Sequence, residues 1–154
     1  MEALWVTSWW GVLLLAAAGL VAFVFSQARP LVPLALAVWV SYAVHEVGHA
    51  ALAIALGAKA KQVRLVRRGA GLGVVAPPLS PGRTRTVAVG GPLAGILGGV
   101  LVVLVAGSVM HLTAPQLVAP LVVVALNHAV NLLPTAPDGR HLFARARIVD
   151  PALQ

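Results

Sequence analysis

The stretch VSYAVHEVGHAALAIALG, residues 40–57, has the composition of a buried apolar helix, yet two histidines and a glutamate stand near its middle. These residues are His45, Glu46 and His49. An ionisable side chain at membrane depth costs about 2.5–3.5 kcal/mol on insertion scales, so such a residue is first treated as functional. Three of them within five positions are difficult to explain by packing. The stretch therefore predicts a buried apolar helix that carries a candidate functional site.

The whole chain is as apolar as this stretch. Of its 154 residues, 60% are hydrophobic and 10% are charged, whereas an ordinary soluble domain is about 25% charged. This composition indicates an integral membrane protein, and the length indicates a single domain over residues 1–154. The sequence contains no cysteine, so no thiolate is present to ligate a metal.

Long uncharged segments suited to crossing a membrane occur four times. A spanning helix needs about 20 mostly apolar residues. We therefore predict an all-α membrane protein with four transmembrane helices, at about residues 4–25, 31–57, 87–110 and 116–134. The first segment is preceded by Glu2 and by no Lys or Arg. This is not typical of a signal peptide, so we expect it to be a span.

The positive charges are concentrated on one side of the predicted membrane. All Lys and Arg residues except Arg29 lie in the loop 58–86 or after residue 139. The positive-inside rule then places this loop and both termini in the cytoplasm. Glu2 and Arg29, on either side of the first span, favour the opposite orientation, but the larger count decides. Since topology accounts for the net charge of +7 and no nucleic-acid-binding motif accompanies it, we expect no nucleic-acid partner.

The loop 58–86 has the pattern of a possible short β-hairpin. Residues 61–68, KQVRLVRR, alternate polar and apolar side chains over part of their length, as a half-buried strand does. Pro77, Pro78 and Pro81 end the pattern. A strand here could pair with an unwound peptide substrate by edge addition. Alternatively, it is a basic segment that rests on anionic lipid.

The predicted third span carries three regularly spaced glycines. Gly91, Gly95 and Gly99 form a doubled G-x-x-x-G pattern. Small residues at this spacing let the backbones of two helices approach closely in lipid. We interpret the pattern as a signal for tight helix packing rather than for chemistry.

The residues HEVGH at 45–49 form an H-E-x-x-H motif. Histidines four positions apart lie on one helix face, where two imidazoles can take two corners of a zinc tetrahedron. Glu46 points about 100° round the helix and can reach an activated water without being a ligand. This is the arrangement of a zinc peptidase. A structural zinc site, or a His–Glu pair that holds helices together, is the alternative.

Zinc requires a third protein ligand. No histidine stands at position 55 and no glutamate follows His49, so two common forms of the extended motif are excluded. The remaining candidates are Asp138, Asp150, His128 and His141. Asp138 follows the predicted cytoplasmic end of the fourth span, and His49 lies near the cytoplasmic end of the second. Both are therefore expected near the same face of the membrane.

Three motifs together resemble the site-2 protease family of intramembrane zinc metalloproteases. They are HEVGH at 45–49, GGPLAG at 90–95 and NLLPTAPDG at 131–139. The resemblance covers about residues 38–140, so the first span would be an addition to this core. It implies that Zn²⁺ is the cofactor, with these roles in the site: His45 and His49 as the histidine ligands, Asp138 as the aspartate ligand and Glu46 as the catalytic glutamate.

The chain departs from the family pattern at two positions. Pro137 directly precedes Asp138, whereas members usually have one more residue, often leucine, between the last proline and the aspartate. Gly95 stands where many members have an asparagine. Asn131 matches the asparagine that opens the closing motif of the family.

Polar residues of the fourth span are lesser candidates for the site. Asn127 and Asn131 share a helix face, where they either bond between helices or contact the substrate or its oxyanion. His128 is a further possible contact of this kind, a partner that supports a ligand, or an alternative ligand.

The resemblance implies a zinc metalloendopeptidase. It would hydrolyse peptide bonds of membrane-spanning or membrane-adjacent proteins near the cytoplasmic face, with a membrane protein substrate and the lipid bilayer as its partners. We expect it in the bacterial cell membrane with both termini cytoplasmic. A non-catalytic metal-binding subunit or chaperone on the same scaffold is the alternative. An ion transporter would require polar residues along several spans, and the sequence has only one such cluster.

Overall fold

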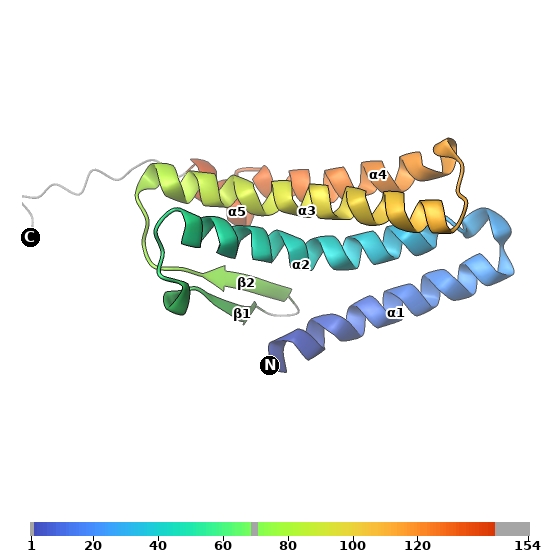
Figure 1. The fold of residues 1–154 in the computed structure, drawn as a ribbon, viewed down its shortest axis with the longest axis horizontal. Coiled ribbons are helices and arrows are strands. Elements are labelled where there is room, and N and C mark those ends of the chain that lie inside the picture. The colour runs from blue at the N-terminus through green and yellow to red at the C-terminus, as the bar shows by residue number, and fades with distance from the viewer. Residues whose placement is uncertain (1, 69–70, 144–154) are drawn as a thin grey trace, which may run out of the picture.

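The computed structural model describes residues 2–68 and 71–143 as a helical bundle with a small hairpin at one end (Figure 1). The main elements, in chain order, are α1 (Glu2–Val24), α2 (Leu31–Ala55), β1 (Arg64–Arg68), β2 (Gly71–Val75), α3 (Pro81–Val109), α4 (Ala114–Ala129) and α5 (Pro137–Phe143). A short 3-10 turn, η3 (Val130–Leu132), continues α4. Asp150 lies outside the described residues.

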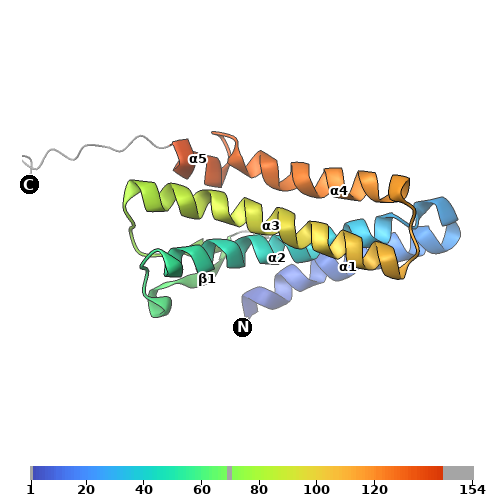
Figure 2. The ribbon, with the colours of Figure 1, turned by 45° about the horizontal axis from the view of Figure 1, so that its top comes forward.

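Helices α2, α3 and α4 form the centre of the bundle, and α3 packs against both of the others. Figure 2 shows α3 between α2 and α4. Helix α1 packs against α2 and crosses it at an angle (Figure 1). The buried core of the three central helices contains Ala37, Val103 and Val124. The hairpin and α5 both lie at the end of the bundle where α2 ends and α3 begins (Figure 1).

Three helical segments of the described chain are long and apolar enough to cross a membrane. They are Ser26–Ala55, Pro81–Val109 and Ala114–Leu132. Large apolar side chains on their outer faces are exposed, including Leu97 at 70%, which suits lipid and not water. The first helix qualifies only as a shorter apolar segment, Trp9–Val24. Of the four predicted spans, three are therefore supported, and the first stays a prediction.

The hairpin predicted in the loop is present. Strands β1 and β2 pair antiparallel, with Arg64 opposite Val75 and Arg67 opposite Leu72. The fold is therefore helical with a two-stranded sheet. β2 packs against α2, and Leu72 is buried.

The chain reverses at the end of α2 through Gly57. Its φ of 110° lies in the left-handed region, where glycine has no steric penalty. The Ala58 N–H bonds to the Ala53 carbonyl at 2.9 Å and the Gly57 N–H to the Ile54 carbonyl at 3.0 Å. These two bonds form a Schellman motif, which satisfies the last carbonyls of α2. The reversal returns the chain toward the hairpin.

Three buried glycines of α3 lie where its backbone meets bulky side chains of α2 and α4. A Cβ on Gly91 would overlap the His49 imidazole, and one on Gly95 would overlap the His128 imidazole. A Cβ on Gly99 would meet the Val124 side chain. The predicted close packing is therefore present. Two of the three glycines make room for histidine rings.

Candidate metal centre

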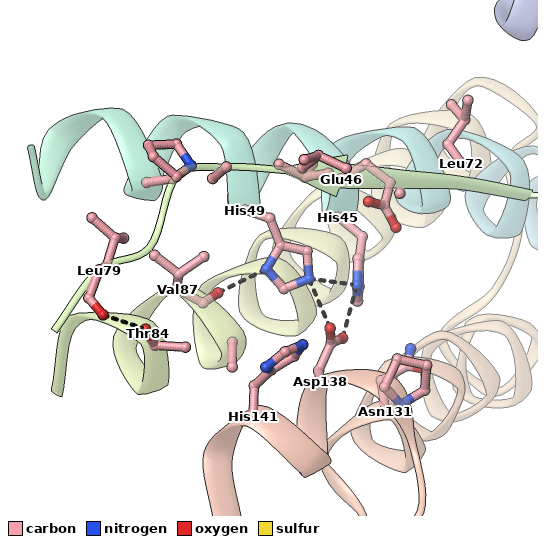
Figure 3. A pocket seen from close by; sticks show the side chains of 18 of the residues that line it. His45, Glu46, His49, Leu72, Leu79, Thr84, Val87, Asn131, Asp138 and His141 are labelled. Atoms are coloured by element: carbon pink, nitrogen blue, oxygen red, sulfur yellow. Dashed lines mark hydrogen bonds and ion pairs between the residues drawn. The ribbon is translucent and has the colours of Figure 1, made fainter. Parts of the chain in front are cut away.

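Two histidines of α2 and one aspartate of α5 converge at the hairpin end of the bundle. His45 Nε2 lies 3.1 Å from Asp138 Oδ2, and His49 Nε2 lies 3.1 Å from Asp138 Oδ1. The two Nε2 atoms are 3.1 Å apart. The histidines are only 5% and 8% exposed. Figure 3 shows Asp138 reaching from α5 toward both imidazoles.

These separations suit a tetrahedral metal ion. Ligand atoms at zinc bond lengths of about 2.0–2.1 Å lie about 3.3–3.4 Å apart in a regular tetrahedron. The ligand atoms of His45, His49 and Asp138 all lie within 4.8 Å of one another. In the described part of the chain, no other cluster of three or more His, Asp or Glu side chains meets this criterion. Three protein ligands leave the fourth position open, as catalytic zinc sites require.

The outer nitrogen of His49 supports this interpretation. His49 Nδ1 lies 2.7 Å from the Val87 carbonyl oxygen. A carbonyl can only accept, so the proton of the neutral ring is on Nδ1 and Nε2 carries a lone pair. That lone pair is directed at a carboxylate, which also only accepts. A metal cation between the lone pair of Nε2 and the carboxylate would bind to both. Metal-bound histidines commonly donate their other N–H to a carbonyl in this way.

Helix α3 contains a proline directly after Gly91, the glycine that faces the His49 ring. Pro92 lies inside α3, and it lacks the N–H that would bond to the Ala88 carbonyl one turn earlier. The Val87 carbonyl that accepts from His49 belongs to this same turn. Helix α3 thus supplies both the space for the His49 ring, at Gly91, and an acceptor for its outer nitrogen, at Val87.

Asp138 is held in the form that binds metal. Burial by itself raises the pKa of its carboxyl, but when no metal is bound, hydrogen bonds and positive charge from protonated His45 and His49 outweigh burial and hold the pKa well below its usual range. Asp138 is therefore ionised at neutral pH. A carboxylate must be deprotonated to ligate a metal.

The backbone of α5 explains how Asp138 reaches the site with Pro137 directly before it. Pro137 is the first residue of the helix, where its fixed φ suits the helix and its missing N–H is not needed. Asp138 is in the first turn, where the helix dipole favours a negative charge. Gly139 is buried, and a Cβ there would overlap the Leu133 carbonyl. This close approach seats α5 against the turn after α4.

We expect the Gly139→Ala substitution to lower the stability by about 1–3 kcal/mol and to weaken metal binding, because the obstructing Leu133 carbonyl is backbone. Thermal unfolding and zinc content of the purified protein measure the two effects. Gly82→Ala is the matched control, since a Cβ at Gly82 meets nothing within 4 Å. Equal melting temperatures and zinc contents for the two variants would contradict this close approach.

Glu46 lies beside the three converging side chains without belonging to their set. It is 8% exposed, and it lines the same cavity, of about 600 Å³, as His45, His49 and Asp138. Figure 3 shows its carboxylate near His45. The cavity is also lined by apolar residues of β2 and α3, among them Leu72, Val74 and Val87. A carboxylate in such a place is suited to take and return a proton.

The structure separates the lesser candidates. Asn131 lines the cavity, and its side-chain amide donates to the Asn127 carbonyl at 3.4 Å, within the same segment and not between helices. Asn127 is exposed and is not among the lining residues. His141 lines the cavity but does not belong to the ligand cluster. His128 is 1% exposed and contacts His45 from behind, away from the cavity.

Sequence reasoning missed the Val87 carbonyl and the position of His141 in the cavity wall. No side-chain pattern reveals a backbone acceptor. The glycine spacing was the one available signal for the space that the rings occupy. Whether the converging residues bind metal and catalyse hydrolysis stays a prediction.

One comparison with known proteins found a match. A family model described as Peptidase M50B-like matches residues 14–134. The match includes HEVGH and GGPLAG and ends before Asp138. It is consistent with the resemblance to the site-2 protease family. Searches of curated proteins and of solved structures found no match.

Proposed function

Because the chain belongs to the Peptidase M50B-like family, we propose that it is an intramembrane zinc metalloprotease. The family and the three apolar helices indicate a membrane protein, and the cluster of His45, His49 and Asp138 is capable of holding a metal ion. The observation that carries the proposal is the convergence of these three side chains at 3.1 Å separations. The buried Glu46 in the same cavity supports a catalytic rather than a structural centre.

In this proposal three side chains bind the metal ion and a fourth transfers the proton. His45 Nε2, His49 Nε2 and the Asp138 carboxylate hold the ion. A zinc ion bound there would polarise the scissile carbonyl and lower the pKa of a water molecule to about 7. Glu46 accepts the proton of the attacking water and then returns it to the nitrogen of the leaving amine. The apolar part of the cavity wall would strengthen these electrostatic interactions by lowering the local dielectric constant.

The proposed substrate is a membrane-spanning or membrane-adjacent protein, cleaved near the cytoplasmic face of a bacterial cell membrane. His49 lies about one and a half turns before the end of α2 at Ala55, which puts the site about 9 Å from that end. Amides in an intact substrate helix are shielded by their own hydrogen bonds and side chains, so the substrate segment must unwind to be cleaved. The positive-inside rule supports cytoplasmic termini.

The two strands of the hairpin suit different parts of the proposed function. β2 contributes Leu72, Gly73, Val74 and Val75 to the cavity wall, whereas the described side chains of β1, residues 64–67, do not line it. Arg64 and Arg67 of β1 are exposed. Contact with an extended peptide is therefore proposed for β2, and contact with anionic lipid for β1.

Metal removal tests the proposal. The purified protein should contain one zinc per chain by elemental analysis and should cleave a membrane-spanning reporter in proteoliposomes. Dialysis against a strong chelator should abolish cleavage, and stoichiometric Zn²⁺ should restore it, whereas Mg²⁺ should not, because imidazoles favour zinc over magnesium. Undiminished cleavage by protein shown to be metal-free would refute the proposed function.

A further inference from the structure

A buried chain of polar groups runs behind His45, away from the cavity. His45 Nδ1 lies 3.1 Å from His128 Nδ1, and His128 Nε2 lies 2.9 Å from Ser41 Oγ. Ser41 Oγ donates in turn to the Val38 carbonyl at 3.2 Å. Ser41 and His128 are 0% and 1% exposed. The chain links α2 to α4 and ends at a residue of the candidate metal centre.

The directions of these hydrogen bonds follow from the Val38 carbonyl, at which the series of bonds ends. The Val38 carbonyl only accepts, and the single hydroxyl proton of Ser41 is used there. Ser41 Oγ must then accept from His128 Nε2–H, which leaves His128 Nδ1 as an acceptor in the neutral ring. His128 Nδ1 therefore accepts from His45 Nδ1–H. The lone pair of His45 Nε2 is then directed at Asp138 and His49.

The relative placement of the two rings supports a hydrogen bond between them. Their centroids are 5.2 Å apart and their planes differ by 27°. With the two Nδ1 atoms 3.1 Å apart, this larger centroid separation places the nitrogens between the centroids. The rings therefore meet edge to edge, as a hydrogen bond between ring nitrogens requires.

Gly95 of α3 makes room for His128. A Cβ at this position would lie 2.5–2.8 Å from three atoms of the His128 ring. An asparagine here, which the resemblance would favour, cannot coexist with the ring in its present place. The His128 ring thus occupies the space that a side chain at position 95 would need, so the glycine at this position and the buried histidine depend on each other.

We propose that His128, held by Ser41, is a positioning residue that fixes His45 as the Nδ1–H tautomer with Nε2 directed at the metal. The metal part of this inference rests on the proposed function, whereas the hydrogen-bond chain does not. The Val87 carbonyl has the corresponding role for His49. Partners of this kind orient metal-bound histidines, and their loss typically costs about 10–100-fold in metal affinity.

Zinc affinities of His128 variants test the proposal. His128→Leu removes the acceptor for His45 Nδ1–H and should weaken zinc binding by about 10–100-fold, measured by competition with a chromophoric chelator. His128→Gln should restore most of this affinity, because its amide can accept from His45 and donate to Ser41. Val103→Ala, at a fully buried core position of α3, should lower the melting temperature and leave the affinity unchanged.

Two outcomes of this experiment would overturn the proposal. Wild-type affinity in His128→Leu would show that His45 needs no partner. Equal weakening in His128→Leu, His128→Gln and Val103→Ala would show that only packing matters. The rescue by glutamine is the readout that a merely structural role would not produce.

A second measurement keeps the hydrogen-bond chain testable without metal. The ¹⁵N chemical shifts of the histidine rings in metal-free protein at alkaline pH distinguish the tautomers. We expect the proton on Nδ1 of His45 and on Nε2 of His128. The reverse assignment would contradict the proposed directions of the hydrogen bonds from His45 through His128 to Ser41. A wild-type protein that binds no zinc would refute the proposed function, and the tautomers would then decide the hydrogen-bond chain separately.

Discussion

The Glu46→Gln protein is expected to lose peptide hydrolysis by a factor of about 10²–10⁴, the usual contribution of a positioned general acid–base group, and to keep its zinc. Glutamine has nearly the same shape as glutamate but cannot accept the proton of the attacking water. Glu46 does not belong to the His45, His49 and Asp138 cluster, so its loss removes no ligand. Cleavage of a membrane-spanning reporter and the zinc content of the same preparation measure both effects.

The adjacent position provides the control. Val47 follows Glu46 in α2, and its side chain is 56% exposed, so Val47→Ala should change neither cleavage nor zinc content. A Glu46→Gln protein that retained full activity would exclude Glu46 as the proton acceptor. A wild-type protein that binds zinc without cleaving any membrane substrate would favour the non-catalytic metal-binding subunit, for which Glu46→Gln should have no effect.

The Asp138→Ala protein is expected to bind zinc more than about 100-fold more weakly, beyond the range seen when an outer partner of a ligand is lost. The substitution removes the two oxygens that lie 3.1 Å from the imidazole nitrogens. It leaves two neutral nitrogens to hold the ion, with no anionic ligand. Elemental analysis of the purified variant and chelator competition would measure the loss.

A second substitution separates charge from shape. Asp138→Asn keeps the size of the side chain but loses the negative charge, so we expect weakened binding here as well. Arg140→Ala is the matched control on α5, because Arg140 is exposed and its side chain donates to the Thr135 carbonyl, away from the metal ligands. Unchanged zinc in Asp138→Ala would move the third ligand to His141, since both nitrogens of His128 already have partners.

The helical segments and the pairing of His45 with His49 were readable from the sequence. Hydropathy along α2, α3 and α4 is a local property, and three of the four predicted spans are helices long and apolar enough to cross a membrane. The spacing of four between the histidines places them on one helix face by helix geometry alone. The hairpin was also visible as alternation, because a strand has a period of two.

The remaining parts of the site depend on contacts between distant segments, which local patterns do not encode. On residue types alone, Asp138, Asp150, His128 and His141 stayed open as third ligands. The fold brings Asp138 to the imidazoles and leaves His128 behind His45, 83 positions away in the chain.

The sequence by itself thus determined three helices long and apolar enough to cross a membrane, the H-E-x-x-H pair and the family resemblance, because periodicity and hydropathy are properties of neighbouring residues. Only the tertiary structure decided which side chains meet those histidines and which nitrogen of each ring is directed at the site. Those choices depend on how α3, α4 and α5 pack against α2, with Gly91 and Gly95 leaving room for the rings.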